Sequence, residues 1–408
     1  MVVYSHQRDK GAIHMIYADN AATTALSPKA LSVLVHHAKN TWGNPSSLYA
    51  HGQEAKEVLE QARTQIARCI GAKEREIIFT SGGSEADNQA ILSAAAWGKQ
   101  KGKRHIVSSA FEHHAVLHTL QKLEKEGFEV TYLDVHADGL VRPEEVKAAI
   151  REDTCLVSIM YANNEIGTIQ PIGEIGAICR EKKVLFHTDA VQAIGHIPVN
   201  VVTDQVDMLS ASAHKFHGPK GVGFLYVRQG VPVRSLIEGG AQERGRRAGT
   251  ENVPGIGAMA AALQEAASHM DENARHLKAM QARLIEGLSR IPHGALNGDR
   301  DRRLPGNVSF CFEGIEGEAL LLLLDDKGIC ASSGSACTSG SLDPSHVLLA
   351  FGRVHDVAHG SLRLSLGEDV TEEEIDYIIA CVGEVVAYLR SFSPLWRDLE
   401  AGKKAFIL

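Results

Sequence analysis

Short runs of β-branched and other apolar residues alternate with helical patterns over the first two thirds of the chain. The apolar runs predict strands, and the segments between them have the apolar spacing of helices. The predicted strands lie at 77–80, 105–107, 130–133, 156–161, 184–187, 207–210 and 222–227. The predicted helices between them lie at 85–98, 115–126, 143–150 and 172–181. This alternation predicts an α/β fold in which helices cover both faces of a mostly parallel sheet.

The pattern changes after about residue 252, where strands become sparse and helices longer. The elements predicted there are a helical stretch at 259–290, a strand at 307–310, a helix at 317–327, a strand at 362–365 and a helix at 371–389. Thr371 and Glu374 have the spacing of a capping box at the start of the last helix. Eight of the twelve residues from 332 to 343 are Ser, Thr or Gly, which predicts a mobile loop. We therefore expect a second, smaller α+β domain.

The composition is that of a folded protein with a modest acidic excess. The 408 residues include 42 basic and 50 acidic ones, a formal net charge of −8, and 44% are hydrophobic. These values argue against disorder and against a dedicated nucleic-acid-binding protein. No apolar run reaches the roughly 18 residues that span a bilayer, and residues 1–14 resemble neither a secretory signal nor a presequence. We expect a cytoplasmic protein with no membrane or nucleic-acid partner.

Seven cysteines are spread along the chain without a Cys-x-x-Cys pair, which favours reduced thiols over a secreted disulfide framework. The cysteines that lie in apolar patterns, and are expected in the core, are Cys155, Cys179, Cys311 and Cys381. Cys69 and Cys330 fit either a core or a surface position. The neighbours of Cys337 are too small and polar to bury it. Because a few per cent of such a thiol is ionised at neutral pH, Cys337 is a candidate nucleophile.

A lysine follows a predicted strand in the segment Ser210-Ala-Ser212-Ala-His214-Lys215-Phe-His-Gly-Pro-Lys220. A lysine becomes a nucleophile when desolvation or a neighbouring cation lowers its pKa. Lys220 fits an ordinary basic surface turn, which is the usual place for a loop lysine. Lys215 is the better candidate for a chemical role, because other segments supply what a pyridoxal-phosphate site needs.

Two predicted strands end in segments whose side chains suit a pyridoxal-phosphate site. Phe186-His-Thr-Asp189-Ala-Val-Gln192 places an acid where open α/β sheets bind ligands. A buried Asp189 can hold a pyridine nitrogen protonated, although a helix N-cap is an equally ordinary use of it. Gln192 would lie beside it on a helical turn, within reach of a ring hydroxyl. Thr80-Ser-Gly-Gly83-Ser84-Glu85 joins a strand to a helix and can hold a phosphate at the positive helix end.

Histidines gather in Glu112-His113-His114-x-x-x-His118. The spacing of His114 and His118 suits a metal pair on one helix face, but no third ligand is apparent nearby, so we expect no metal. Stacking on a planar cofactor is a better use of His113. Asn163-Asn164 at the end of a predicted strand, followed by Gly167, indicates a loop.

Together these segments resemble the pyridoxal-phosphate-dependent cysteine desulfurases of the NifS/IscS group, within the class-V aminotransferases. The similarity runs from Ile16-Tyr-Ala-Asp-Asn-Ala-Ala-Thr-Thr24 to about Trp396. Further matching blocks are Gly43-Asn-Pro-Ser-Ser47, Gly239-Gly-Ala-Gln-Glu-Arg-Gly-Arg-Arg-Ala-Gly-Thr250 and Ser333-Gly-Ser-Ala-Cys337. The resemblance implies fold type I, with a seven-stranded sheet in a large domain at 25–260. It also implies a small domain built from 1–24 and 261–408, with the cysteine loop at about 330–345.

The resemblance implies a role for each candidate residue. Lys215 would bind pyridoxal 5'-phosphate covalently, His113 would stack on its ring, and Asp189 would pair with the ring nitrogen. The remaining cofactor contacts would come from Gln192, Gly83, Ser84, Ser212, His214, Asn164 and, across a homodimer, Thr250. Arg363, helped by Asn164, would bind the substrate carboxylate with its two-pronged guanidinium.

The implied reaction converts L-cysteine to L-alanine. Lys215 would take the α-proton, His113 would move the thiol proton, and Cys337 would attack the substrate sulfur to form a persulfide. The persulfide would pass to an acceptor such as an iron–sulfur scaffold protein. Nitrogenase clusters, general iron–sulfur assembly and tRNA thiolation all remain open as destinations. The alternative activity is that of a selenocysteine lyase or a related β-lyase or aminotransferase.

The sequence departs from the family pattern at three places. His196 follows Gly195 where relatives often have Lys, and Ser84 replaces a more usual Thr while keeping the hydroxyl. The tail after Trp396 does not resemble the segment by which housekeeping members dock their scaffold. This difference in the tail concerns the identity of the sulfur acceptor and not the chemistry.

Overall fold

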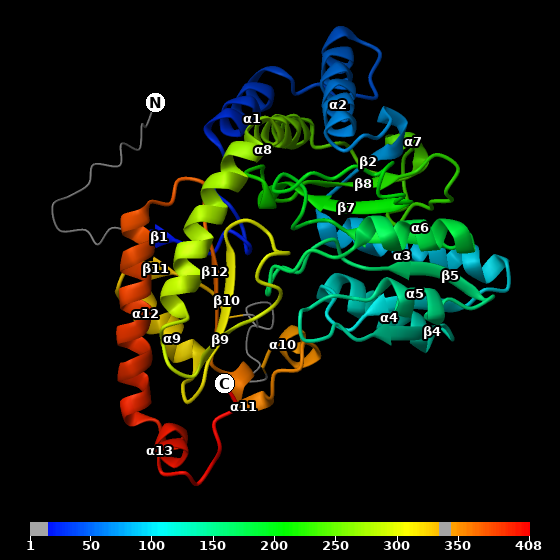
Figure 1. Cartoon of the computed structure of the whole chain (residues 1–408). Coiled ribbons are helices and arrows are strands. Elements are labelled where there is room, and N and C mark those ends of the chain that lie inside the picture. Colours follow the sequence, from blue (N-terminus) through cyan, green and yellow to red (C-terminus); the bar gives the residue numbers. More distant parts are fainter. Residues whose placement is uncertain (1–14, 334–343) are drawn as a thin grey trace.

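A seven-stranded sheet forms the centre of the larger part of the molecule (Figure 1). The computed structural model describes residues 15–333 and 344–408. The strands follow the order β2-β8-β7-β6-β5-β3-β4 across the sheet. Their bounds are β2 (Ile77–Thr80), β3 (His105–Ser109), β4 (Glu129–Leu133), β5 (Thr154–Ser158), β6 (Leu185–Asp189), β7 (Met208–Ser212) and β8 (Gly223–Val227). β8 is antiparallel to both neighbours and the other pairs are parallel, which confirms the predicted α/β sheet.

Helices cover both faces of this sheet, because successive strand residues point to opposite faces. Ile77 and Phe186 belong to one buried cluster, while Ile78 and Leu185, their chain neighbours, belong to another. The first cluster includes residues of α2 (Ala50–Cys69), α6 (Ile172–Lys182) and the first part of α8 (Val253–Leu288). The second is closed by α3 (Gly83–Gln100) and α4 (His114–Lys125).

A second core lies around a three-stranded antiparallel sheet, β12-β10-β9 (Figure 1). Its strands are β12 (Ser361–Ser365), β10 (Asn307–Phe312) and β9 (Gly294–Leu296), and a separate pair joins β1 (Ile16–Tyr17) to β11 (Ile329–Cys330). The core includes Leu277 and Leu284 from the second part of α8, together with Ile16 near the start of the described chain. The long helix α8 therefore contributes to both cores. The domain boundaries near residues 25 and 260 stay a prediction.

The remaining helices are α1 (Pro28–Asn40), α5 (Pro143–Ala149), α7 (Gln242–Gly245), α9 (Gly317–Asp326), α10 (His346–Ala350), α11 (His355–Ala358), α12 (Glu372–Phe392) and α13 (Pro394–Glu400), with short 3-10 turns at η1 (Glu74–Glu76) and η2 (Ala213–Lys215). The capping box of Thr371 and Glu374 at α12 is confirmed. Val347 and Val357, from α10 and α11, pack into the core of the large sheet although they lie far along the chain.

Among the described residues, no helix alone has the length and apolar character needed to cross a bilayer. Only α12 and α13 taken together satisfy those criteria, with a bend of 86° between them.

Candidate active site

The carboxyl ends of neighbouring parallel strands bring the predicted site residues to one edge of the large sheet. Asp189 is the last residue of β6 and Ser212 the last residue of β7, as the sequence predicted for a strand-end acid. His113 follows β3 as the N-cap of α4, and Asn164 lies in the loop after β5. Because β7, β6, β5 and β3 are adjacent, His113 and Asp189 meet here although they are 76 positions apart in the chain.

Lys215 is held at the end of the turn η2 by contacts to a distant part of the chain. Its Nζ donates to the carbonyl oxygens of Ala21 and Ala22 at 2.6 and 2.8 Å. Its own carbonyl oxygen accepts from Nε2 of His196 at 2.8 Å. His196 thus fixes the backbone that carries Lys215, which gives a physical role to one of the departures from the family pattern.

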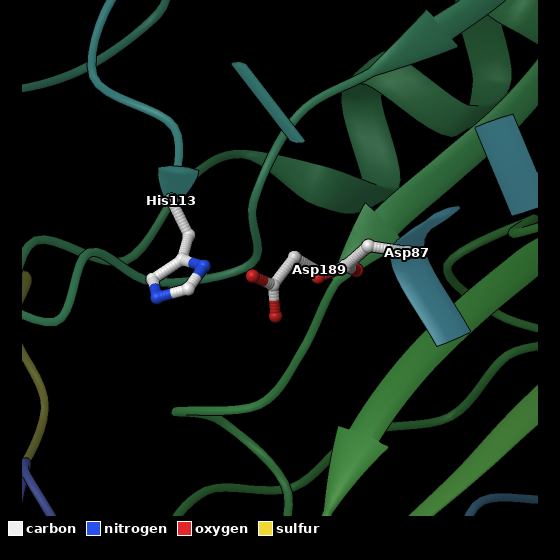
Figure 2. A group of neighbouring side chains, drawn as sticks. All are labelled: Asp87, His113 and Asp189. Carbon is white, nitrogen blue, oxygen red and sulfur yellow. The ribbon is translucent and has the colours of Figure 1, made fainter. Parts of the chain in front are cut away.

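Asp189 and His113 face each other across the site, and Asp87 from α3 lies behind Asp189 (Figure 2). One ligand atom from each of the three lies within 4.8 Å of the others. Burial raises the pKa of Asp189, while the charges of His113 and Lys215 oppose that rise. Burial and the neighbouring Asp189 raise the pKa of Asp87 well above its usual range. A cation between His113 and Asp189 would relieve this carboxyl pair.

Gln192 reaches the same carbonyl as Lys215 does. Its Nε2 donates to the oxygen of Ala21 at 2.9 Å. The segment after Asp189 forms hydrogen-bonded turns in place of the expected helical turn, and Oδ1 of Asp189 accepts from the amide of Val191 at 2.9 Å. Gln192 is nevertheless buried beside the site, because the turns fold it back toward the segment at Ala21.

His214 lies next to Lys215 and contacts the same N-terminal segment. Its Nδ1 is 3.1 Å from Oγ1 of Thr23. Burial and the charge of Lys215 lower the pKa of His214 to about 4, so the ring is neutral at physiological pH.

The start of α3 packs closely against Ser212. A Cβ atom on Gly83 would lie 2.6 Å from Val191 Cγ2, so a larger residue there would force Val191 to move. A Cβ atom on Gly82 would lie 3.5 Å from the hydroxyl of Ser212. The exposed Ser84 follows in the first turn of α3. The amides at the start of an 18-residue helix and these hydroxyls form a cradle of the kind that binds phosphate.

Arg363 lies on β12, with its guanidinium directed at the loop after β5. Its Nη1 donates to the carbonyl oxygen of Asn164 at 3.3 Å, and its Nη2 to Asp19 Oδ1 at 2.8 Å. Its Nε is buried without a hydrogen-bond partner. A buried guanidinium nitrogen with an unused proton is suited to an incoming carboxylate.

Glu165, which the sequence analysis did not single out, is a buried residue of this same loop. It accepts a 2.5 Å hydrogen bond from Oγ of Ser345, the N-cap of α10. Burial raises the pKa of Glu165 to about 7, against the effects of Ser345 and Arg363. On the other side of residues 334–343, Ser332 pairs with Arg363 through both backbone groups, at 2.6 and 3.1 Å. Local sequence patterns could not have predicted the contact between Ser345 and Glu165, because these two residues are 180 positions apart in the chain.

Of the predicted site residues that the structure describes, Thr250 is not brought together with the others. Thr250 is exposed, just before α8. Cys337 lies outside the described residues.

The structure does confirm the other cysteine predictions, with Cys155, Cys179, Cys311 and Cys381 buried, while Cys69 and Cys330 are half-buried. Burial raises the pKa of Cys155 to about 12 and of Cys311 to about 11, so these thiols are unreactive at neutral pH.

The residues at this edge of the sheet fit pyridoxal 5'-phosphate. The buried pair Asp87 and Asp189 offers a place for a protonated pyridine nitrogen, and Lys215 supplies the amine. The amides at the start of α3, with the hydroxyls of Ser84 and Ser212, supply the phosphate cradle. The residues that would hold the group are therefore Lys215, Asp189, His113, Gln192, Ser212, His214, Gly83 and Ser84.

Comparison with known proteins decides the family. The model of the aminotransferase class-V family matches residues 16–378. The chain belongs to the class-V aminotransferase family. Within it, the chain is 52% identical over 392 residues to the cysteine desulfurase IscS of Clostridium botulinum (strain Hall), covering 95% of this chain and 98% of that protein. It is 54% identical over 380 residues to IscS of Methanosarcina thermophila, covering 93% and 94% of the two chains.

Solved structures of similar proteins agree with the fold. A NifS-like protein superposes with a TM-score of 0.86 at 40% identity, covering 92% of this chain and 100% of that one. The structure of SspA in complex with cysteine superposes with a TM-score of 0.76 at 36% identity, covering 86% and 98%. The predicted fold class, a fold-type I sheet flanked by helices, is confirmed.

Proposed function

We propose that this protein is a pyridoxal-phosphate-dependent cysteine desulfurase, which converts L-cysteine to L-alanine and forms a persulfide on Cys337. The observation that carries the proposal is the meeting of Lys215, Asp189 and His113 in a chain about half identical to proteins named cysteine desulfurase. The structure of SspA with cysteine adds a relative that binds this amino acid.

The bound cofactor would supply an electron sink for the electron pair that remains when the substrate loses its α-proton. Arg363 binds the substrate carboxylate, using its free Nε proton and the Nη2 group that now contacts Asp19. Lys215 Nζ takes the α-proton, since its amine is already held at the site by Ala21 and Ala22. Asp189 keeps the ring nitrogen protonated.

Sulfur transfer then depends on two further groups. His113 moves the proton of the substrate thiol, and burial lowers its pKa so that the neutral ring is available as a base. The Cys337 thiolate attacks the substrate sulfur and a sulfur–sulfur bond forms, while the bond between that sulfur and Cβ breaks. The electron pair of the broken bond stays with the substrate, and Cβ takes up a proton to become the methyl group of alanine. Alanine leaves, and the persulfide is passed to an acceptor such as an iron–sulfur scaffold protein. A reducing cytoplasm suits a thiol that must be regenerated after each turnover.

The test is a single-turnover assay with the cofactor-loaded protein and L-cysteine. We expect one alanine and one persulfide per active site, with the extra sulfur found on Cys337 by mass spectrometry. A Cys337→Ser variant should release no alanine from L-cysteine. If that variant made alanine at the normal rate, the desulfurase proposal would fail and a selenocysteine lyase or a related enzyme that needs no nucleophilic thiol would replace it.

We further propose that the active unit is a homodimer in which Thr250 contacts the phosphate held by the partner subunit. Exposed Thr250 supports this, as does an apolar group on the loop between α1 and α2, where Leu48 is 93% and Trp42 69% exposed. Such a surface favours burial against another chain.

Light scattering should therefore give twice the mass of one chain. A Leu48→Glu variant should shift the equilibrium toward monomer, because the interface would bury an unpaired charge. The matched control is Val202→Glu, at another exposed apolar side chain, 68% exposed, which should leave the dimer unchanged. A fully active monomer would contradict the proposal.

A further inference from the structure

Three histidines meet beside the active site without taking part in it. His114 and His118 lie one turn apart on α4, with ring centroids 5.0 Å apart. The ring of His346, the first residue of α10, lies 4.6 Å from that of His114 on another side. The sequence showed only the pair on α4, because the third ring comes from 232 positions further along the chain than His114. We define these three as the histidine cluster.

Protonation is unfavourable for two rings of the histidine cluster. Burial, followed by the charges that His346 and His118 would carry, lowers the pKa of His114 to about 4. Burial also lowers the pKa of His346. Both rings are therefore neutral at physiological pH and keep a nitrogen lone pair. Neutral imidazole is the form of histidine that binds metal ions.

His346 already has the arrangement of a supported metal ligand. Its Nε2 is 3.0 Å from the carbonyl oxygen of Glu112. Since a carbonyl can only accept, Nε2 must carry the proton and Nδ1 the lone pair. Metal-binding histidines commonly donate their second ring nitrogen to a backbone carbonyl in this way, which fixes the tautomer and the ring.

We propose that His114, His118 and His346 form a binding site for a transition-metal dication such as Zn²⁺. A tetrahedral ion bound by three imidazoles keeps a fourth position for water. The nitrogens of the three rings do not all lie within 4.8 Å of one another in the present rotamers, so binding includes a rotation of at least one ring. His118 is exposed and is free to make that rotation.

The site is separate from the cofactor site. His113 is excluded from the cluster, because its Nδ1 accepts from the amide of Ala115 at 3.1 Å and its ring faces Asp189. Asp87, His113 and Asp189 lie closer together, but they surround the place of the pyridine nitrogen. A bound ion in the histidine cluster would instead join α4 to α10.

A second pair of histidines, on α11, provides a matched control. His355 and His359 on α11 also lie one turn apart, with ring centroids 4.5 Å apart, and Oε2 of Glu316 is 3.9 Å from Nδ1 of His359. In the described part of the chain, no third imidazole contacts this pair. This pair therefore tests whether any two histidines one helical turn apart are enough to bind the metal ion.

The experiment is calorimetric titration of Zn²⁺ into metal-free, cofactor-loaded protein, in a Cys337→Ser background that removes the candidate thiol ligand. Titration with Co²⁺ reports the geometry through its visible absorption. We expect one tightly bound ion. His118→Ala and His346→Ala should each weaken binding at least roughly tenfold, since even supporting residues are worth that much. His359→Ala should leave the affinity unchanged.

Cofactor absorption checks that each variant folds, and the exposed His118 gives a variant whose folding is not at risk. In metal-free buffer, with Cys337 restored, His118→Ala should keep the desulfurase activity of the parent protein. The proposal is overturned if His118→Ala binds Zn²⁺ as tightly as its parent, if His346→Ala does so, or if His359→Ala removes the bound ion.

Discussion

Replacing Lys215 with alanine should abolish alanine formation from L-cysteine, with a loss of at least about 10³-fold. A positioned group that transfers a proton contributes roughly 10²–10⁴-fold, and the same amine would also attach the cofactor. The amine of Lys215 is placed for both tasks by its bonds to Ala21 and Ala22. Borohydride treatment followed by peptide mapping should fix the cofactor to the wild-type peptide and leave the variant unlabelled.

The matched control for this prediction is Lys220→Ala. Lys220 lies five residues further along the chain but is exposed, and a surface substitution of this kind usually changes stability by less than about 0.5 kcal/mol. Its activity should equal that of the wild type. The cofactor-free Lys215→Ala protein should lose about 1–3 kcal/mol of stability, because two carbonyls lose a charged donor. A Lys215→Ala protein with more than a tenth of normal activity would refute the assignment.

The strand and helix pattern of the large sheet was predictable because its periodicity is local. Ile77 and Ile78 are consecutive in the sequence, and they pack into the cores on opposite faces of the sheet. Asp189 could be placed at a strand end for the same reason, since a strand and the turn after it are neighbours in the chain. The helices α1 and α2 were not predicted.

The contacts between distant segments could not be predicted from local patterns. The carbonyl of Ala21 accepts from both Lys215 and Gln192, which lie more than 170 positions away. Ser345 and Glu165 meet across a similar separation. Family resemblance supplied the roles of Lys215 and Arg363, but not these supporting contacts, which depend on how the second core packs against the first.

The second large effect should come from Asp189→Asn. A pyridine nitrogen stays protonated only while a carboxylate faces it, and an amide cannot take that role. Loss of one electrostatic stabiliser of this kind costs roughly 10²–10³-fold in kcat. We therefore expect kcat to fall by that factor while the KM for L-cysteine changes little, because Arg363 still binds the carboxylate. Stopped-flow absorbance and steady-state alanine assays measure the two quantities.

In the cofactor-free protein, Asp189→Asn should raise the stability although it lowers kcat in the loaded enzyme. Asp87 and Asp189 are both buried, and the charge of Asp189 raises the free energy of ionising Asp87. Asp189→Asn removes that repulsion, so the thermal midpoint of the cofactor-free protein should rise. Asp87→Asn relieves the same repulsion but leaves the carboxylate that faces His113, and it should cost less than about tenfold in kcat, well below the effect of losing a direct stabiliser. Equal losses in the two variants would mean that Asp189 has no special role at the ring nitrogen, whereas a large loss confined to Asp189→Asn assigns the electrostatic work to that carboxylate.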